Sequence, residues 1–355
     1  KSISTPLLLW SSFVFIRSVH VDTTVIAVIR FLRYLVLYPL LFLFTLASCK
    51  ITERSFLRIM RILFLSAGVV FIIAWLDALT EFGNTYTTNM LVQGGLPFTK
   101  TRAISTLGSP NNLGSYAGLV MVAIAILNAE GVLQGVVSRR FALILFVGAI
   151  GSLFFSFSRG ALFAFLVTLP WILYLYRKRG YSGHGFLIVA LMGILMLLVF
   201  LVINEARGPS VSFNSRIDKI SYNIELMAEV PWSYFIGLGI ARGYTSGESL
   251  LSLEGLDFTR ADNFFLMIFV EGGLIGLGLF LNLLVSIVKK LKTSHGIVRS
   301  SIQRTGCSLA IGMLLYLIGW GFTSVSFRLF PAAYLTWMFI GVALSLIRHE
   351  QKSMR

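Results

Sequence analysis

The sequence predicts an all-α fold of the polytopic membrane type, on two observations. Hydrophobic residues make up 56% of the 355-residue chain, and the mean hydropathy is +0.84. The apolar residues also gather in repeated runs close to the roughly 20 residues that a helix needs to cross a bilayer core. A bilayer cannot satisfy unpaired backbone groups, and the chain lacks the alternating segments of a transmembrane barrel, so helices are the remaining architecture.

Ten hydrophobic segments are predicted to span the membrane, in one bundle. They lie at residues 3–18, 24–48, 59–79, 112–129, 140–157, 160–176, 186–204, 263–288, 305–322 and 330–347. Basic residues gather in every second loop and in the C-terminal tail, so the positive-inside rule places these loops and both chain ends in the cytoplasm. The chain opens without Met almost inside its first span. We therefore expect missing N-terminal residues, with two further helices that would make twelve.

Seven arginines are expected on the opposite, outward side, against the same rule. They are Arg102, Arg159, Arg207, Arg216, Arg242, Arg260 and Arg328. Cations on that side need acidic neighbours or an anionic ligand to hold them there. The formal net charge of +15 comes mainly from the cytoplasmic loops, so it gives no reason to expect a nucleic-acid partner.

A long outward segment divides the chain. Three regions are therefore predicted: a first part of the bundle at 1–204, an outward cap at 205–262 and a C-terminal part of the bundle at 263–355. Within the cap, Ser215 or Asn214 begins an amphipathic helix that ends before Pro231. Its apolar stripe consists of Ile217, Ile220, Ile224 and Met227. We expect this helix to lie against the membrane or the bundle.

Cysteine, histidine and glycine point to structural roles. Cys49 and Cys307 both map near the cytoplasmic face, where thiols stay reduced, so no disulfide is expected. The four histidines are scattered without the spacing of a metal site. The sequence therefore predicts neither a metal nor another cofactor. Gly272, Gly273 and Gly276 lie inside a span, where they are predicted to let helices pack closely.

Five short motifs point to one family. They are RAISTLGSPNNLGSYAG (102–118), FSRGALFAF (157–165), NSRIDK (214–219), PWSYFIGLGIARG (231–243) and ADNFFLMIFVEGGLIGLG (261–278). In this order, and at these membrane positions, they resemble the O-antigen polymerase and ligase superfamily, often called the Wzy-C family. The resemblance covers about residues 100–290.

The resemblance implies a C-type glycosyltransferase fold with a helical periplasmic cap, in the bacterial inner membrane, with the active site facing the periplasm. Members of this family transfer a glycan from an undecaprenyl-diphosphate carrier to a growing polymer or to a lipid A core. They need neither nucleotide sugars nor metal ions. The expected partners are the lipid-diphosphate-linked donor and acceptor, membrane lipids and, as is usual in the family, a chain-length regulator protein.

Arginines suit the leaving diphosphate, because a guanidinium group can bind phosphate oxygens bidentately. Arg159 and Arg216 match arginines of the family, and we assign both to donor-diphosphate binding. Arg159 could instead snorkel to the membrane interface, and Arg216 could pair with Asp218 or Glu225. Further candidates for substrate binding are Arg102, Arg242 and Arg260, with Tyr244 as a residue that stacks on sugars.

Asp262 and Asn263 mark a departure from the ligases of the family. In ligases, the residue before this Asn is typically a His, thought to act as general base or to orient the acceptor. A carboxylate can also accept a proton from an attacking hydroxyl, so Asp262 is the candidate base and Asn263 a candidate substrate-binding residue. Asp262 could instead cap the following helix. The substitute candidates for the base are Glu248, Glu254 and Glu81.

The Asp at this position favours a polymerase that joins O-antigen, capsular or exopolysaccharide repeat units with inversion at the anomeric carbon. An O-antigen ligase that transfers glycan to lipid A core is the closer alternative. A transporter of polysaccharide or lipid-linked glycan is the second alternative. The chain shows no internal repeat of the kind that transporters carry.

Overall fold

The computed structural model describes residues 3–19, 49, 51–80, 103, 105–180, 193–194, 197–198, 201, 220–239, 263–298, 300–324 and 331–353. Every element in these ranges is a helix, so the predicted all-α class is confirmed for them. The chain divides into two compact units. The smaller unit takes Lys1–Leu41, Pro209–Thr293 and Gly321–Arg328, and the larger unit takes Phe42–Gly208, Ser294–Trp320 and Leu329–Arg355.

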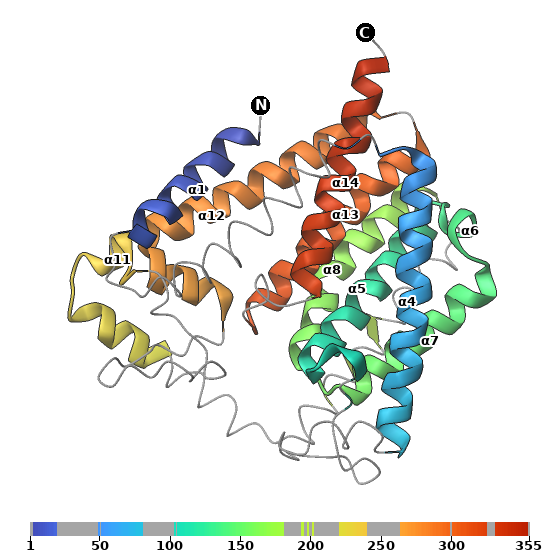
Figure 1. Ribbon diagram of the computed structural model, residues 1–355, viewed down its shortest axis with the longest axis horizontal. Coiled ribbons are helices and arrows are strands. Elements are labelled where there is room, and N and C mark those ends of the chain that lie inside the picture. The colour runs from blue at the N-terminus through green and yellow to red at the C-terminus, as the bar shows by residue number, and fades with distance from the viewer. Residues whose placement is uncertain are drawn as a thin grey trace. The chain divides into compact units, whose positions relative to one another are not determined.

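The larger unit is a helical bundle built around α5 (Pro110–Ala129), whose side chains are buried on all sides. Three long helices pack against α5: α4 (Glu53–Thr80), α7 (Arg139–Phe155) and α8 (Arg159–Lys178) (Figure 1). The short helices η3 (Ser105–Leu107) and α6 (Leu133–Val136) adjoin its two ends. Most of α13 (Ser301–Gly321) and all of α14 (Ala332–Ser353) belong to the same unit.

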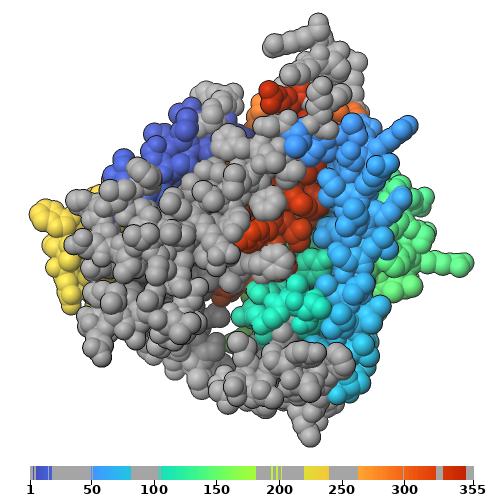
Figure 2. Space-filling view, in the orientation of Figure 1, coloured from blue at the N-terminus to red at the C-terminus, as the bar shows by residue number. Residues whose placement is uncertain are grey.

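The outer surface of α4 has the character of a lipid-facing helix. Figure 2 shows α4 exposed along most of its length. Its exposed apolar side chains recur every three or four residues: Ile62, Leu65, Val69, Ile72, Leu76 and Leu79. Such a stripe, on the side of a helix that turns away from the protein, is what hydrocarbon chains would cover. The position of α4 therefore agrees with the predicted span at 59–79.

Five described helices are long and apolar enough to cross a membrane: Glu53–Thr80, Pro110–Ala129, Arg159–Lys178, Phe264–Ile297 and Ser301–Gly321. Three more predicted spans coincide with α1 (Ser4–Val19), α7 and α14. The predicted spans 24–48 and most of 186–204 lie outside the described residues. Helix α4 begins before residue 59 because helical hydrogen bonds form equally well in water, so a helix can continue past its apolar part.

Segments predicted to share one side of the membrane meet at one end of the larger unit. Arg61 donates hydrogen bonds to the carbonyls of Val136 and Gly135, and the Ser300 hydroxyl donates to Glu53. Each of these residues lies in or next to a loop that the charge pattern places in the cytoplasm. The contacts agree with the predicted alternation of loops.

The smaller unit contains α1, the described part of the cap and most of α12 (Phe264–Ile297). Residues 220–228 are helical, as predicted, and α11 (Ser233–Ile236) follows Pro231. The apolar stripe is only partly as predicted: Met227 is buried together with Asn223, whereas Ile220 and Ile224 are exposed. Exposed isoleucines on one face are typical of a helix that lies on a membrane surface.

Helix α12 is broken at Gly273, which has φ 63° and ψ −165°. The carbonyls of Val270 and Glu271 accept hydrogen bonds from the backbone N–H groups of Leu238 (2.7 Å) and Gly239 (3.2 Å). A segment of the cap therefore supplies partners for carbonyls at the break, as a break inside a bilayer requires.

Two glycines make this junction possible. A Cβ at Gly273 would lie 2.3 Å from the backbone of Phe235, and a Cβ at Gly237 would lie 2.2 Å from the Glu271 carbonyl oxygen. Both glycines also have positive φ. Close helix packing is confirmed for Gly272 and Gly276, which face Phe13 of α1. Gly273 also allows a close approach, to the backbone of Phe235 in α11, and it forms a break in α12 that the packing prediction did not include.

Replacing Gly273 by Ala should destabilise the protein by about 2 kcal/mol or more, because the left-handed backbone and the contact with Phe235 both exclude a Cβ. The measurement is the thermal unfolding midpoint of the purified protein in detergent. Gly278→Ala in the same helix is the matched control, since a Cβ there meets open space. Equal midpoints for the two variants would contradict the close contact at the break.

Candidate functional site

Arg159 and Asn263 are the residues of the predicted site that lie in the described ranges. The other candidates lie outside these ranges, and their roles remain predictions. They are Asp262, Arg216, Arg242, Arg260, Arg102 and Tyr244, with the substitute acids Glu81, Glu248 and Glu254. Arg159 belongs to the larger unit and Asn263 to the smaller one.

Arg159 opens α8, directly after a sharp reversal of the chain from α7. Phe157 in this reversal is fully buried and has a φ of 50°, a strained conformation for a bulky residue. Ser158, the N-cap residue of α8, is also buried, and its backbone N–H donates to the Ser156 hydroxyl at 3.3 Å. The buried reversal fixes the first turn of α8, from which the half-buried Arg159 extends.

The reversal packs against the beginning of α5. A Cβ at Gly114 would lie 2.5 Å from the Cβ of Ser158 and 2.7 Å from the hydroxyl oxygen of Ser156. A residue without a side chain is therefore required at Gly114. The two helix starts lie side by side as a result. Each follows a serine, Ser109 before α5 and Ser158 before α8, whose side chain makes no capping hydrogen bond.

The paired helix starts create a positive electrostatic environment. The first N–H groups of an α-helix have no partner within the helix, and the helix dipole places about half a unit of positive charge there. Neither first turn contains an acidic residue. Arg159 adds a positively charged side chain at the first position of α8, and a helix start with a nearby cation is a typical place for an anion to bind. This end of the larger unit therefore suits an anionic ligand.

Asn263 is the N-cap of α12. Its Oδ1 accepts hydrogen bonds from the backbone N–H groups of Phe265 (2.8 Å) and Leu266 (3.2 Å). Its Nδ2 donates to the Phe322 carbonyl at 3.1 Å, which ties the start of α12 to the end of α13. The capping role that the sequence allowed for Asp262 thus belongs to Asn263, because α12 begins one residue later than predicted.

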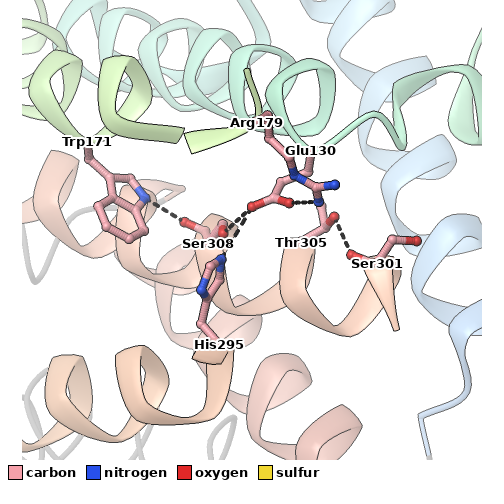
Figure 3. Close-up of polar contacts among 7 residues, drawn as sticks. All are labelled: Glu130, Trp171, Arg179, His295, Ser301, Thr305 and Ser308. Atoms are coloured by element: carbon pink, nitrogen blue, oxygen red, sulfur yellow. Dashed lines mark hydrogen bonds and ion pairs between the residues drawn. The ribbon is translucent and has the colours of Figure 1, made fainter. Parts of the chain in front are cut away.

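A second polar cluster lies at the predicted cytoplasmic end of the larger unit, around Glu130 (Figure 3). The Glu130 carboxylate pairs with Arg179 and accepts a hydrogen bond from the Ser308 hydroxyl at 2.7 Å. Nε2 of His295 lies 3.5 Å from Oε1 of the same Glu130 carboxylate. Trp171 donates from its indole to the Ser308 carbonyl at 3.1 Å. The cluster joins the ends of α5, α8 and α12 to α13.

The partners of Glu130 keep it ionised. Burial alone would raise the pKa of this carboxyl group, since only 3% of the residue is exposed. Hydrogen bonds from His295, Arg179 and Ser308, together with the charge of Arg179, outweigh burial and lower the pKa from 4.5 to about 2. Because its donors are protein groups, we assign the cluster a structural role in fastening the helix ends.

Asp77, near the end of α4, is a buried acid to which the sequence interpretation gave no role. It is 6% exposed, and its Oδ2 accepts a hydrogen bond from the backbone N–H of Ser105 at 2.6 Å. The available signal was an ionisable residue inside an apolar run, which in a membrane span indicates function.

No group of three or more His, Cys, Asp or Glu side chains gathers within the part of the chain that the structure describes.

The apolar helices, the broken α12 and the positively charged start of α8 define a multi-pass helical membrane protein. Residues 142–281 match the family model of the O-antigen ligases, Wzy-C, which confirms the family resemblance for that region. The matched region includes Arg159, Arg216, Asp262 and Asn263. No curated protein matches the chain. The match indicates a membrane enzyme of the O-antigen ligase or polymerase type, which handles lipid-linked glycans.

Replacing Asn263 by Ala should destabilise α12 by about 1 kcal/mol, because two backbone N–H groups lose their acceptor. Asn263→Asp keeps an acceptor oxygen and places a negative charge at the helix start. Its unfolding midpoint should therefore lie closer than that of Asn263→Ala to the midpoint of the unmodified protein. Thermal unfolding in detergent compares the variants. Equal losses for Ala and Asp would contradict the capping role.

Stability should depend on pH through Glu130. The pKa is lower in the folded protein than the usual 4.5, so the unfolded chain takes up this proton first when the solution is acidified. The stabilisation is present above about pH 4.5 and is lost as the pH falls toward 2. Glu130→Gln should cost about 2 kcal/mol at neutral pH and remove this part of the acid dependence.

Unfolding midpoints of the unmodified protein and Glu130→Gln, measured across this pH range, test the prediction. The two curves should converge as the pH falls. Curves that stay parallel would show that the Glu130 carboxylate is not stabilised by its partners.

Proposed function

We propose that the protein is an inverting, metal-independent glycosyltransferase. It polymerises undecaprenyl-diphosphate-linked repeat units of O-antigen, capsule or exopolysaccharide at the periplasmic face of the bacterial inner membrane. The observation that carries the proposal is the placement of Arg159 on the first turn of α8, beside the start of α5. The family match over residues 142–281 supports it.

The start of α7 shows what distinguishes Arg159 from an ordinary arginine at a helix end. Arg139 occupies the same first position in α7. There the helix has its own cap, because the hydroxyl of Ser138 accepts a hydrogen bond from the backbone N–H of Phe141 at 3.3 Å, and Arg139 is exposed. At the start of α8 the preceding serine makes no such bond, Arg159 is half-buried, and a second helix start adjoins. These differences favour anion binding at Arg159.

A lipid diphosphate fits this environment. In the proposed reaction, the acceptor hydroxyl oxygen attacks the anomeric carbon of the donor sugar from the face opposite the diphosphate. The bond between this carbon and the phosphate oxygen breaks, and its electron pair leaves with the lipid diphosphate. Arg159 and Arg216 bind the oxygens on which this charge develops, which can stabilise a transition state by about 3 kcal/mol.

The proton of the attacking hydroxyl goes to a carboxylate. Asp262 is the proposed base. The capping of α12 by Asn263 supports this assignment, because it removes the structural reason for an acid at position 262. Arg102, Arg242, Arg260 and Tyr244 are proposed to bind the glycan and its phosphates, and a chain-length regulator is the proposed protein partner.

The polymerase is favoured over the ligase by the Asp that stands where ligases of the family typically carry His. The matched family is that of the O-antigen ligases, which keeps the ligase as the second candidate. The product distinguishes them: a polymerase lengthens the lipid-linked glycan, whereas a ligase moves it to lipid A core. Transporters also contain broken helices, and they use the carbonyls at the break to bind their substrate or ions. In this chain the carbonyls of Val270 and Glu271 accept hydrogen bonds from the cap segment instead, which disfavours a transporter.

Replacing Arg159 by Ala should lower the rate of glycan transfer about 100-fold, because the developing charge loses its cation. The rate of Arg159→Lys should lie between those of the unmodified enzyme and Arg159→Ala, since an ammonium keeps the charge but not the bidentate geometry. The substrate is a lipid extract from cells of the same strain that lack this gene and therefore accumulate the lipid-linked repeat unit. Polymer is detected by gel electrophoresis after reaction with protein purified in nanodiscs, without added metal.

Arg139→Ala is the matched control, because it removes an arginine from the same position of another helix in the same unit. It should leave the rate within about twofold of the unmodified enzyme. Equal rates for Arg159→Ala and the unmodified enzyme would refute the assignment of Arg159. A preparation that forms no glycosidic bond, but moves the lipid-linked glycan across the nanodisc or liposome bilayer, would refute the enzyme itself.

A further inference from the structure

Asp77 carries a buried carboxylate near the end of α4. A carboxylate that is 6% exposed near the end of a membrane helix is costly unless hydrogen bonds compensate for the lost water. The Oδ2 atom of Asp77 accepts the backbone N–H of Ser105 at 2.6 Å, a charge-assisted bond. Asp77 therefore holds the loop that leads into α5.

Ser105 needs this support because its backbone is strained. Its φ of 54° lies in the left-handed region, which costs a residue other than glycine about 1 kcal/mol. Its hydroxyl donates to the Val70 carbonyl of α4 at 2.8 Å. The residue is thus attached to α4 at two points, through its N–H at Asp77 and its hydroxyl at Val70. An unsupported chain would not keep this conformation.

The contacts continue from this loop to the start of α8. Ala103 is 2% exposed and packs on Ala74 and Ala78 of α4. Its backbone N–H donates to the Phe155 carbonyl at 3.1 Å, at the last residue of α7. The chain reverses after Phe155 and begins α8 with Arg159.

We propose that Asp77 is a positioning residue of the active site. By holding Ser105 in its strained conformation, it keeps Ala103 against the end of α7 and so fixes the reversal that presents Arg159. The inference rests on the proposed function for its effect on catalysis, but its structural part can be measured without any reaction.

The conservative substitution separates positioning from chemistry. Asp77→Asn keeps an oxygen that can accept the Ser105 N–H, whereas Asp77→Ala removes the acceptor. If Asp77 only positions the loop, Asn should retain activity within about threefold and Ala should lose tenfold or more, since a hydrogen bond to a charged group is worth about that much. If the carboxylate itself took up a proton, Asn would be as inactive as Ala.

Hydrogen–deuterium exchange gives the readout that does not depend on activity. Peptides containing Ser105 should exchange about tenfold faster in Asp77→Ala and near the normal rate in Asp77→Asn, because exchange reports loss of the N–H bond. Glu53→Ala is the matched control. It removes a carboxylate bonded to a serine at the other end of the same helix, so it should leave exchange at Ser105 and glycan transfer unchanged.

Two results would overturn the inference: unchanged exchange at Ser105 in Asp77→Ala, or loss of transfer in Asp77→Asn equal to that in Asp77→Ala. A failure of the proposed function gives a different pattern. In that case the unmodified protein forms no glycosidic bond, while the exchange difference between the Ala and Asn variants persists.

Discussion

Every backbone polar group inside a bilayer must find its partner within the protein, and this requirement shapes both units of the chain. Where α12 breaks at Gly273, the Leu238 and Gly239 N–H groups meet the carbonyls of the preceding turn. Where α7 ends, the Ala103 N–H meets the Phe155 carbonyl. The carbonyls at the break in α12 and at the end of α7 are thus bonded by segments from distant parts of the sequence. The same hydrogen bonds hold those segments in place.

The segments that fill the breaks are those that carry the family resemblance. Residues 235–239 lie along the break in α12, and Ala103 and Gly114 adjoin the reversal before α8. This explains why these motifs combine glycine with small polar residues. Gly114 and Gly237 admit another backbone or turn at distances that a Cβ would block. The cationic start of α8 follows from the same packing, because the buried reversal leaves Arg159 at a defined edge of the bundle.

The sequence predicted what local patterns encode. Hydropathy located α5 and α8 to within two residues. The motifs drew attention to Arg159, which opens α8, and to Asn263, which caps α12, and the roles of both in the site remain proposals. Contacts between distant segments left no local pattern. Glu130 is 49 residues from Arg179 and 165 from His295, so nothing near Glu130 in the sequence indicates its ion pairs. The sequence does not predict the break at Gly273, because a glycine that allows close packing and a glycine that breaks a helix leave the same pattern. The sequence does not predict the contact of Asp77, because its partner is the backbone N–H of Ser105 and every residue except proline has such a group.

The central claim is that the start of α8 binds the lipid diphosphate. A cryo-electron microscopy structure of the protein in nanodiscs with undecaprenyl diphosphate tests it most directly. The account predicts density for the diphosphate within hydrogen-bonding distance of the Arg159 guanidinium and the first N–H groups of α8, next to the start of α5. A diphosphate bound elsewhere on the protein, with Arg159 turned toward lipid headgroups, would contradict it.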